Sequence, residues 1–208
     1  MKNKYANPNI KISKVYTKAG DRGKTDLIGG ISVSKDDIRV TSYGEIDELN
    51  VLIGFCIFHL KNIKAIASKE YLLSRLISIQ NELFNLGTVL ASVGSDSSAN
   101  LPKVDDEDII LLENDIDTMN KSLDSLESFI LPGGNELSLH LHLARVVCRR
   151  AERSVVSVIN KYKETDTKII EYLNRLSDYL FVLGRSVSKS IGEEEELWNP
   201  NNISSNKS

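Results

Sequence analysis

The sequence contains few thiols, with only two cysteines among its 208 residues. Cys56 and Cys148 each stand in an apolar stretch, and they lack the spacing of a metal-binding motif. So few thiols in a chain of this size favour a reduced compartment over an oxidising one. We therefore expect a cytoplasmic protein.

Long apolar runs and basic blocks are also missing. No stretch approaches the ~18–20 apolar residues of a membrane span. The N-terminal residues MKNKYANPNIKISKVY lack the apolar core of a signal peptide, and they are too short and asparagine-rich for a transit peptide. Lys and Arg total 26 against 29 Asp and Glu, a formal net charge of −3. This balance argues against nucleic acid as the main partner. We expect neither a membrane nor a nucleic acid partner.

Histidine is scarce as well, and the common catalytic motifs are absent. The chain has three histidines and neither an HExxH nor a GxSxG motif. Glu136 and His140 are one residue too far apart for the Glu-x-x-His pair of di-iron bundles. His140 and His142 alternate with leucines, and His59 lies in an apolar run, so we interpret at least two of the three as packing residues. Positioning and charge neutralisation are then more plausible means of catalysis than proton transfer.

The chain has instead the composition of an ordinary globular domain, with 41% hydrophobic and 26% charged residues. Apolar residues recur at intervals of three and four along five long segments, which predicts amphipathic helices. A capping-box pattern at Ser42 and Glu45 predicts the start of the first helix. Asp105, followed by three further acidic residues, predicts the start of the third. The expected helices span about 42–60, 68–93, 105–123, 136–163 and 166–191.

Five helices with short connections and almost no strand pattern predict an all-α fold, a five-helix up-and-down bundle with a Gly-rich N-terminal loop. We divide the chain into a flexible N-terminus (1–16), with a possible short strand over 11–16, a single helical domain (17–192) and an acidic/disordered tail (193–208). Within this tail, the acidic run with Trp198 ends the ordered part, and the last residues, NPNNISSNKS, are expected to be disordered. The chain length agrees with one domain.

The clearest polar feature is a row of charged residues on the fourth predicted helix. Four arginines fall within the nine residues 145–153, beside an apolar stripe. They would repel one another without an anion or carboxylates nearby, and the arginine fork binds phosphate oxygens well. Three interpretations stay open at this point. They are a solvated helix face with Arg–Glu pairs, a nucleotide phosphate site, and a charged subunit interface.

A glycine-rich segment over 17–30 is the second feature. Gly23, Lys24 and Thr25 match the end of a P-loop, but the required first glycine is replaced by Lys18, so a Walker A motif is excluded. A loop that wraps phosphate and a surface loop without a ligand are both compatible with this composition.

Two further groups of polar residues have open interpretations. Asn174 and Asp178 lie one turn apart beside Arg175, as expected for a hydrogen-bond network or a site. Asp47 and Glu48, near the start of the first helix, could pair with arginines of the fourth, within the chain or across an interface. They could also simply stabilise the helix start.

Taken together, five segments resemble the PduO-type ATP:cob(I)alamin adenosyltransferases. They are YTKAGDRGKT (16–25), RVTSYGEIDELN (39–50), FILPGG (129–134), RVVCRRAER (145–153) and LNRLSDYLF (173–181). Each alone is a weak signal, but all five occur in the family's order over about 15–185, which is highly specific. The resemblance implies a ferritin-like five-helix bundle that forms a homotrimer with ATP between subunits. It implies that the 5′-deoxyadenosyl group of ATP passes to cob(I)alamin, giving adenosylcobalamin and triphosphate.

The resemblance also implies roles for individual residues. Asp47 and Arg145 would form an interface salt bridge beside the nucleotide, Arg149 would be central to the site, and Phe129 would close the lower face of the corrin. Mg²⁺ would accompany ATP. A flavoprotein reductase and an adenosylcobalamin-dependent acceptor enzyme are further implied partners. The implied nucleotide-binding residues are Thr17, Lys18, Ala19, Gly20, Thr25, Asp26, Lys35, Arg149, Arg150, Ala151, Glu152, Arg153 and Asn174.

Two alternatives to an enzyme remain. One is a non-catalytic bundle of the same family that senses or delivers nucleotide or corrinoid. The other is a phosphate-binding interaction protein of a different class. The complete Phe129 and Arg149 motifs argue against the first.

Overall fold

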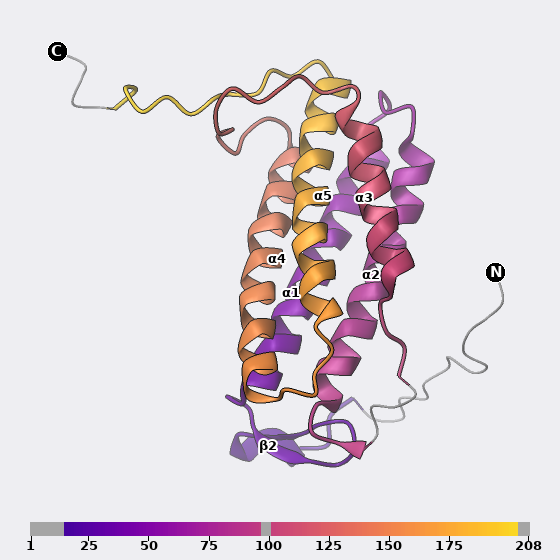
Figure 1. Cartoon of the computed structure of the whole chain (residues 1–208), viewed down its shortest axis with the longest axis vertical. Coiled ribbons are helices and arrows are strands. Elements are labelled where there is room, and N and C mark those ends of the chain that lie inside the picture. Colours follow the sequence, from indigo (N-terminus) through magenta and orange to yellow (C-terminus); the bar gives the residue numbers. More distant parts are fainter. Residues whose placement is uncertain (1–14, 97–100, 204–208) are drawn as a thin grey trace.

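The computed structural model describes residues 15–96 and 101–203, which form a bundle of five long helices (Figure 1). This confirms the predicted all-α bundle. The helices are α1 (Ile38–Asn62), α2 (Lys69–Ser92), α3 (Asp106–Asn120), α4 (Glu136–Lys161) and α5 (Lys168–Ser190).

The helices lie side by side along one long axis. α1 packs against both α2 and α4, α4 packs against α5, and α5 packs against α3. The stripe predicted on the first helix is buried from Ile46 to Leu60, because its residues repeat on the face that meets α2 and α4. Among the described helices, none is both long and apolar enough to span a membrane.

The start of the first helix was predicted wrongly. α1 begins at Ile38, one turn before Ser42, because Asp37 is its N-cap and accepts a hydrogen bond from the Arg39 amide at 2.9 Å. The Arg39 guanidinium also binds the Asp37 carboxylate and donates to the carbonyl of Val93 at 2.8 Å. Ser42 is therefore buried inside the helix.

The other helix boundaries agree with the sequence to within a few residues. α2 follows Ser68 as predicted. α3 follows Asp105, which forms a capping box with Asp108, and it ends earlier than predicted, at Asn120. α4 ends at Lys161, and α5 begins at Lys168. Predicted and observed helix ends differ most where no strong stop signal, such as a glycine or a proline, directly follows the helix.

The glycine-rich segment forms no α-helix, as predicted, but it contains a 3-10 turn and a hairpin that the sequence did not indicate. A 3-10 turn, η1 (Ala19–Arg22), leads into β1 (Lys24–Asp26), which pairs antiparallel with β2 (Ser32–Ser34). The hairpin lies at the end of the bundle where α4 ends, and the Ile28 amide ties it to the Ala91 carbonyl at 3.0 Å. Of the possible strand over 11–16, residues 11–14 lie outside the described residues, and Val15 and Tyr16 are not in a strand.

A buried ionic network joins α2, α3 and α5. Arg75 is only 4% exposed and pairs with Glu82 at 3.0 Å and with Asp115 of α3 at 3.2 Å. Tyr172 of α5 donates to Glu82, and Tyr71 donates to Asp115. Burial raises the pKa of Glu82, against the opposing effect of Arg75. The network therefore adds polar contacts to the apolar packing that Ile109 and Leu112 of α3 make with the core.

Residues 193–198 return along the bundle end opposite the hairpin (Figure 1). They were expected to form the acidic part of the tail, with Trp198 at the end of the ordered part of the chain. In the structure, Leu197 forms an antiparallel bridge with Ile130, and the Leu131 amide donates to the Glu196 carbonyl at 2.8 Å. This part of the acidic segment therefore packs against the connection between α3 and α4.

Candidate functional site

An arginine row runs along one face of α4. Arg145, Arg149 and Arg153 are spaced four residues apart, so they lie on the same side of the helix. Arg149 and Arg153 are exposed, and Arg153 donates to the Arg149 carbonyl at 3.0 Å. Arg145 is half-buried, and its Nε lacks a hydrogen-bond partner among the described residues. The row therefore presents positive charge that the described residues do not neutralise.

Arg145 is the most enclosed residue of this row. Its guanidinium lies 5.9 Å from the ring centroid of Phe181 on α5. Burial, with a further contribution from Arg149, lowers the pKa of Arg145. A guanidinium in these surroundings gains from an added carboxylate or phosphate.

Arg150 differs from its neighbours because it points toward α1. It forms an ion pair with Glu48, and its Nε lies 3.8 Å from Glu45. Burial raises the pKa of Glu45, while Arg150 lowers it. The hypothesis that Glu48 pairs with an arginine of α4 is thus confirmed, within one chain. The charge of Arg150 is already compensated, and its implied contact with nucleotide remains a prediction.

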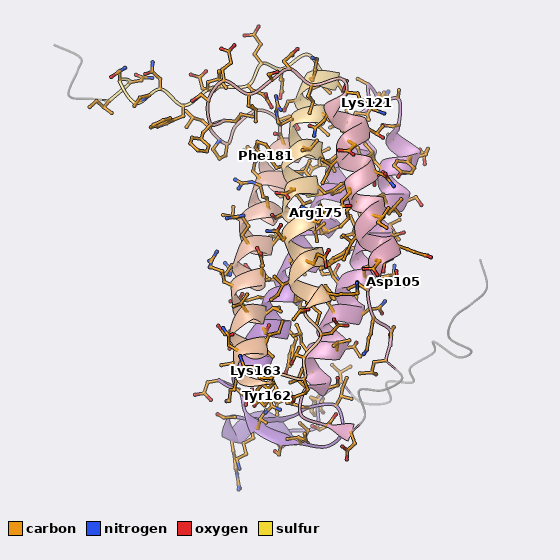
Figure 2. The ribbon with its side chains drawn as sticks, viewed as in Figure 1. Asp105, Lys121, Tyr162, Lys163, Arg175 and Phe181 are labelled. Atoms are coloured by element: carbon orange, nitrogen blue, oxygen red, sulfur yellow. The ribbon has the colours of Figure 1, made fainter. Side chains whose placement is uncertain are left out.

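Asn174 joins the arginine row from α5, whereas Arg175 does not. Asn174 donates to Glu152 of α4 at 3.3 Å, which brings the two polar groups together. Arg175 pairs instead with Glu113 of α3 at 2.8 Å and with Asp178 at 3.3 Å. Figure 2 labels Arg175 on α5, and its ion pair with Glu113 places its guanidinium next to α3. The Arg175–Asp178 pair is therefore a structural network, and only Asn174 belongs with the site.

The predicted loop residues gather around the N-terminal hairpin. Thr17, Lys18 and Ala19 are exposed, Gly20 is half-buried, and Thr25 and Asp26 belong to β1. A Cβ at Gly20 would lie 3.1 Å from the Lys35 Nζ, so the end of the Lys35 side chain lies close to the backbone of the loop at this glycine. The loop lies at the same end of the bundle as the last turn of α4, near Tyr162 and Lys163 in Figure 2.

Asp47 lines a groove between α1 and α2 of about 300 Å³. Gly44 and Gly87 have no side chains that would fill this groove. Asn50 lines it from a buried position, and the exposed Phe84 ring forms an apolar wall. Within the described residues, no ion pair joins Asp47 to Arg145. The implied salt bridge is thus absent from the single chain, and it requires a second chain if it forms.

Phe129 lies in the connection between α3 and α4, at the bundle end opposite the hairpin. Its side chain is 80% exposed, so it does not plug the core of the chain. The ring contacts Trp198 edge to face, with centroids 6.2 Å apart. An exposed aromatic residue held by a second ring is suited to contact a ligand or another chain.

Two aromatic residues of this region were missed by the sequence analysis. Phe181 lies two helical turns after Asn174, and this spacing could have placed it on the same face of α5. Trp198 is the single tryptophan of the chain and follows an acidic run, but only the return of this segment brings it to Phe129. Among the described residues, no group of three or more His, Cys, Asp or Glu side chains is placed to hold a metal ion.

Comparisons with known proteins converge on one family. The family model described as cobalamin adenosyltransferase matches residues 15–187. The corrinoid adenosyltransferase of Bacillus subtilis is 42% identical over 179 residues, which cover 86% of this chain and 89% of the relative. That of Bos taurus is 39% identical over 198 residues, which cover 93% of this chain and 79% of the relative.

Solved structures agree with this result. A variant of the PduO-type ATP:corrinoid adenosyltransferase of Lactobacillus reuteri, complexed with cobalamin and ATP, is 33% identical with a TM-score of 0.81. The match covers 90% of this chain and 97% of that one. Another variant of the same enzyme, complexed with ATP, is 32% identical with a TM-score of 0.78 over 89% of this chain and 100% of that one.

Proposed function

This chain belongs to the cobalamin adenosyltransferase family, and from that premise we propose how its own residues carry out the reaction. The protein is an ATP:corrinoid adenosyltransferase that transfers the 5′-deoxyadenosyl group of ATP to cob(I)alamin. The Co–C5′ bond forms as the C5′–O bond breaks, and the bonding electron pair leaves with triphosphate. The displacement needs no proton transfer, which agrees with a chain of only three histidines.

The arginine row of α4 is the observation that carries this assignment. Triphosphate is a highly charged leaving group, so the reaction accelerates when cations are already held where that charge develops. Arg149 is the central member of the row, and both it and Arg153 are exposed. We assign Arg149 to the triphosphate oxygens, with Glu152 and Asn174 beside it. Ala151, implied as a further nucleotide-binding residue, is fully buried in the core behind this surface.

The N-terminal loop forms the second half of the nucleotide site. Lys18 and Lys35 supply positive charge, and Gly20 permits close approach of the backbone. Thr17, Ala19, Thr25 and Asp26 line the same segment. Mg²⁺ is held chiefly by the phosphates of its substrate in sites of this kind, so we assign it to ATP rather than to a protein cage.

We assign the site to an interface between identical subunits in a homotrimer. Asp47 and Arg145 form no ion pair with each other within the described chain, and the Arg145 Nε lacks an acceptor there. Phe84, which lines the same groove as Asp47, is 67% exposed, and Val51, one helical turn after Asp47 on α1, is 56% exposed. A second copy that covers this groove would bury the apolar surface and bring an arginine to Asp47.

Phe129 is assigned to the lower face of the corrin. An apolar ring there excludes water or the nucleotide base of cobalamin from the cobalt. Loss of that axial ligand makes cob(II)alamin easier to reduce to the nucleophilic cob(I) state. We assign the supply of the electron to a flavoprotein reductase, and the product passes to an adenosylcobalamin-dependent enzyme. Two buried free cysteines are compatible with the cytoplasm as the compartment.

One assay tests the reaction directly. The protein is incubated with ATP, Mg²⁺ and chemically reduced cobalamin, and the absorption spectrum is followed for the Co–C bond. An enzyme forms adenosylcobalamin with many turnovers. A sensor or delivery module of the same family would bind corrinoid without forming the bond, and an unrelated phosphate-binding protein would not bind corrinoid.

A further inference from the structure

The segment that carries Phe129 has no regular structure of its own to hold it. Residues 121–135 connect α3 to α4, and apart from the bridge at Ile130 they form neither helix nor strand. A ring that is 80% exposed on such a segment points in a fixed direction only if something outside the segment fixes it.

The outside contact is the stretch 193–198, which we call the acidic strap. The Trp198 amide donates to the Phe129 carbonyl at 2.7 Å, and the Leu131 amide donates to the Glu196 carbonyl at 2.8 Å. Ser128 donates to the Trp198 carbonyl at 2.8 Å. The strap thus pairs with the backbone on both sides of the Phe129 side chain, while the Trp198 ring rests against it.

The strap is anchored to the bundle by a charged clamp. Arg185 of α5 is 7% exposed, and its Nε lies 3.0 and 3.1 Å from the two carboxylate oxygens of Glu195. Its Nη2 donates to Glu195 at 3.1 Å and to the Asp124 carbonyl at 3.0 Å. One guanidinium therefore holds both the strap and the start of the Phe129 segment with charge-assisted hydrogen bonds.

The beginning of the strap is fixed as firmly. Gly192, with φ of 76°, closes α5 in a Schellman motif, in which the Glu193 amide donates to the Ser188 carbonyl at 2.9 Å. The Glu193 carboxylate then accepts from the backbone and side chain of Asn135, the N-cap of α4, at 2.9 and 2.8 Å. A side chain at Gly134 would lie 2.8 Å from this carboxylate, so glycine is required there.

We propose that the acidic strap is a positioning element for the reaction, in which the Arg185–Glu195 clamp sets the direction of the Phe129 ring. The proposal rests on the role assigned to Phe129 above. The strap lies beyond the residues that the family model matches, which end at 187. Glu195 contacts no reacting atom in this scheme and acts only through Phe129.

Trp198 allows the strap to be observed without any substrate, because it is the single tryptophan of the chain. Glu195→Gln removes the charge of the clamp and keeps its shape. We expect its Trp198 fluorescence to shift to the red and to become more accessible to acrylamide than in the wild type. Glu194→Gln is the matched control, because it makes the same charge change on an exposed neighbour, and its Trp198 signal should stay wild-type.

Activity then tests whether the strap works through Phe129. From cob(II)alamin with a mild reductant, Glu195→Gln should be slower by about 10- to 100-fold, the usual cost of misplacing a catalytic group. From chemically supplied cob(I)alamin it should be nearly unaffected. Electron paramagnetic resonance of bound cob(II)alamin should show more of the form with an axial ligand. In a Phe129→Ala background, Glu195→Gln should cost little more, since the two changes remove one effect.

The outcomes separate the two proposals. If Glu195→Gln makes Trp198 more accessible but leaves the rate from cob(II)alamin unchanged, the positioning role is overturned and the proposed function stays intact. The same holds if the losses of Phe129→Ala and Glu195→Gln add up in the double variant. An unchanged Trp198 signal in Glu195→Gln overturns the clamp. Failure of the wild type to adenosylate supplied cob(I)alamin overturns the proposed function itself. If Glu195→Gln does not fold, Glu193→Gln loosens the other anchor without leaving Arg185 unpaired, and the same results are expected.

Discussion

Arg149 is the residue on which the proposed chemistry most depends, because it is the exposed centre of the arginine row. We expect Arg149→Ala to keep the fold and nearly abolish turnover. Loss of a charge-assisted contact costs about 1.5–3 kcal/mol, and more in a dry site, which corresponds to a loss of at least about tenfold. Steady-state rates at low and saturating ATP measure the effect. Arg175→Ala is the control, since that arginine pairs with Glu113 on the other side of α5. Wild-type rates in Arg149→Ala would contradict the assignment.

Phe129 offers a second test at the scale of the single residue. Its exposure means that Phe129→Ala should not lower the melting temperature, because no core contact is lost. We expect a sharp fall in rate when the reaction starts from cob(II)alamin and a mild reductant, and a much smaller one from supplied cob(I)alamin. The difference arises because the ring assists the formation of the nucleophile rather than its attack. Equal losses in both assays would refute this role.

At the scale of the element, the start of α1 makes stability depend on pH. The hydrogen bonds from Arg39 lower the pKa of Asp37 to about 2. The unfolded value is about 3.9, so the folded state favours the ionised carboxylate, and its contribution is complete above that pH. It is then lost as the pH falls through about 2.

Asn is as good an N-cap as Asp, so Asp37→Asn removes only the charge that the Arg39 guanidinium binds. It should lower the free energy of unfolding at neutral pH by up to about 1.5–3 kcal/mol, the range for a hydrogen bond to a charged group. Urea unfolding of both proteins at several pH values measures this, and the difference should shrink as the pH falls below about 4. Asp36→Asn is a control on an exposed neighbour. A difference that stays constant down to low pH would show that the charge of Asp37 does not contribute.

The N-terminal hairpin is the element expected to respond to nucleotide. Its loop carries Lys18, Arg22 and Lys24 against Asp21, so the segment 17–25 attracts an anion. We expect its amides to gain protection from hydrogen exchange when MgATP is added, because the loop closes around the phosphates. The buried stripe of α1 serves as an internal reference that should not change. Equal protection with and without MgATP would favour the interpretation as a surface loop without a ligand.

At the scale of the whole molecule, we expect an obligate oligomer, a trimer. Light scattering at micromolar concentration measures its mass, and a monomer would refute the assembly. Asp47→Asn should weaken ATP affinity, because the Arg145 of a neighbouring subunit loses its carboxylate beside the nucleotide. Glu70→Asn, on an exposed site of α2, is a control. Unchanged ATP affinity in Asp47→Asn would refute the proposed ion pair between Asp47 and Arg145, but it would not refute the trimer.

The amino-acid sequence by itself determined the helices, the core stripes and the family. These depend on local patterns, such as the apolar repeat from Ile46 to Leu60 and the capping box at Asp105, which need only neighbours within one or two turns. The five motifs, including the arginine row, are likewise contiguous stretches of sequence. The true start of α1 was missed although it too is local, because Asp37 is secured by Arg39, which in turn binds the distant Val93.

Only the tertiary structure decided which charges are compensated and what holds Phe129. Arg150 meets Glu48, 102 residues away in sequence, while Arg149, its neighbour, stays exposed. Arg75 finds Asp115 across 40 residues, and Ser128 reaches Trp198 across 70. No periodic pattern encodes such pairs, because each depends on how two separate elements approach one another. In the folded protein, the acidic strap and Trp198, which the sequence placed in the tail, support the exposed ring of Phe129.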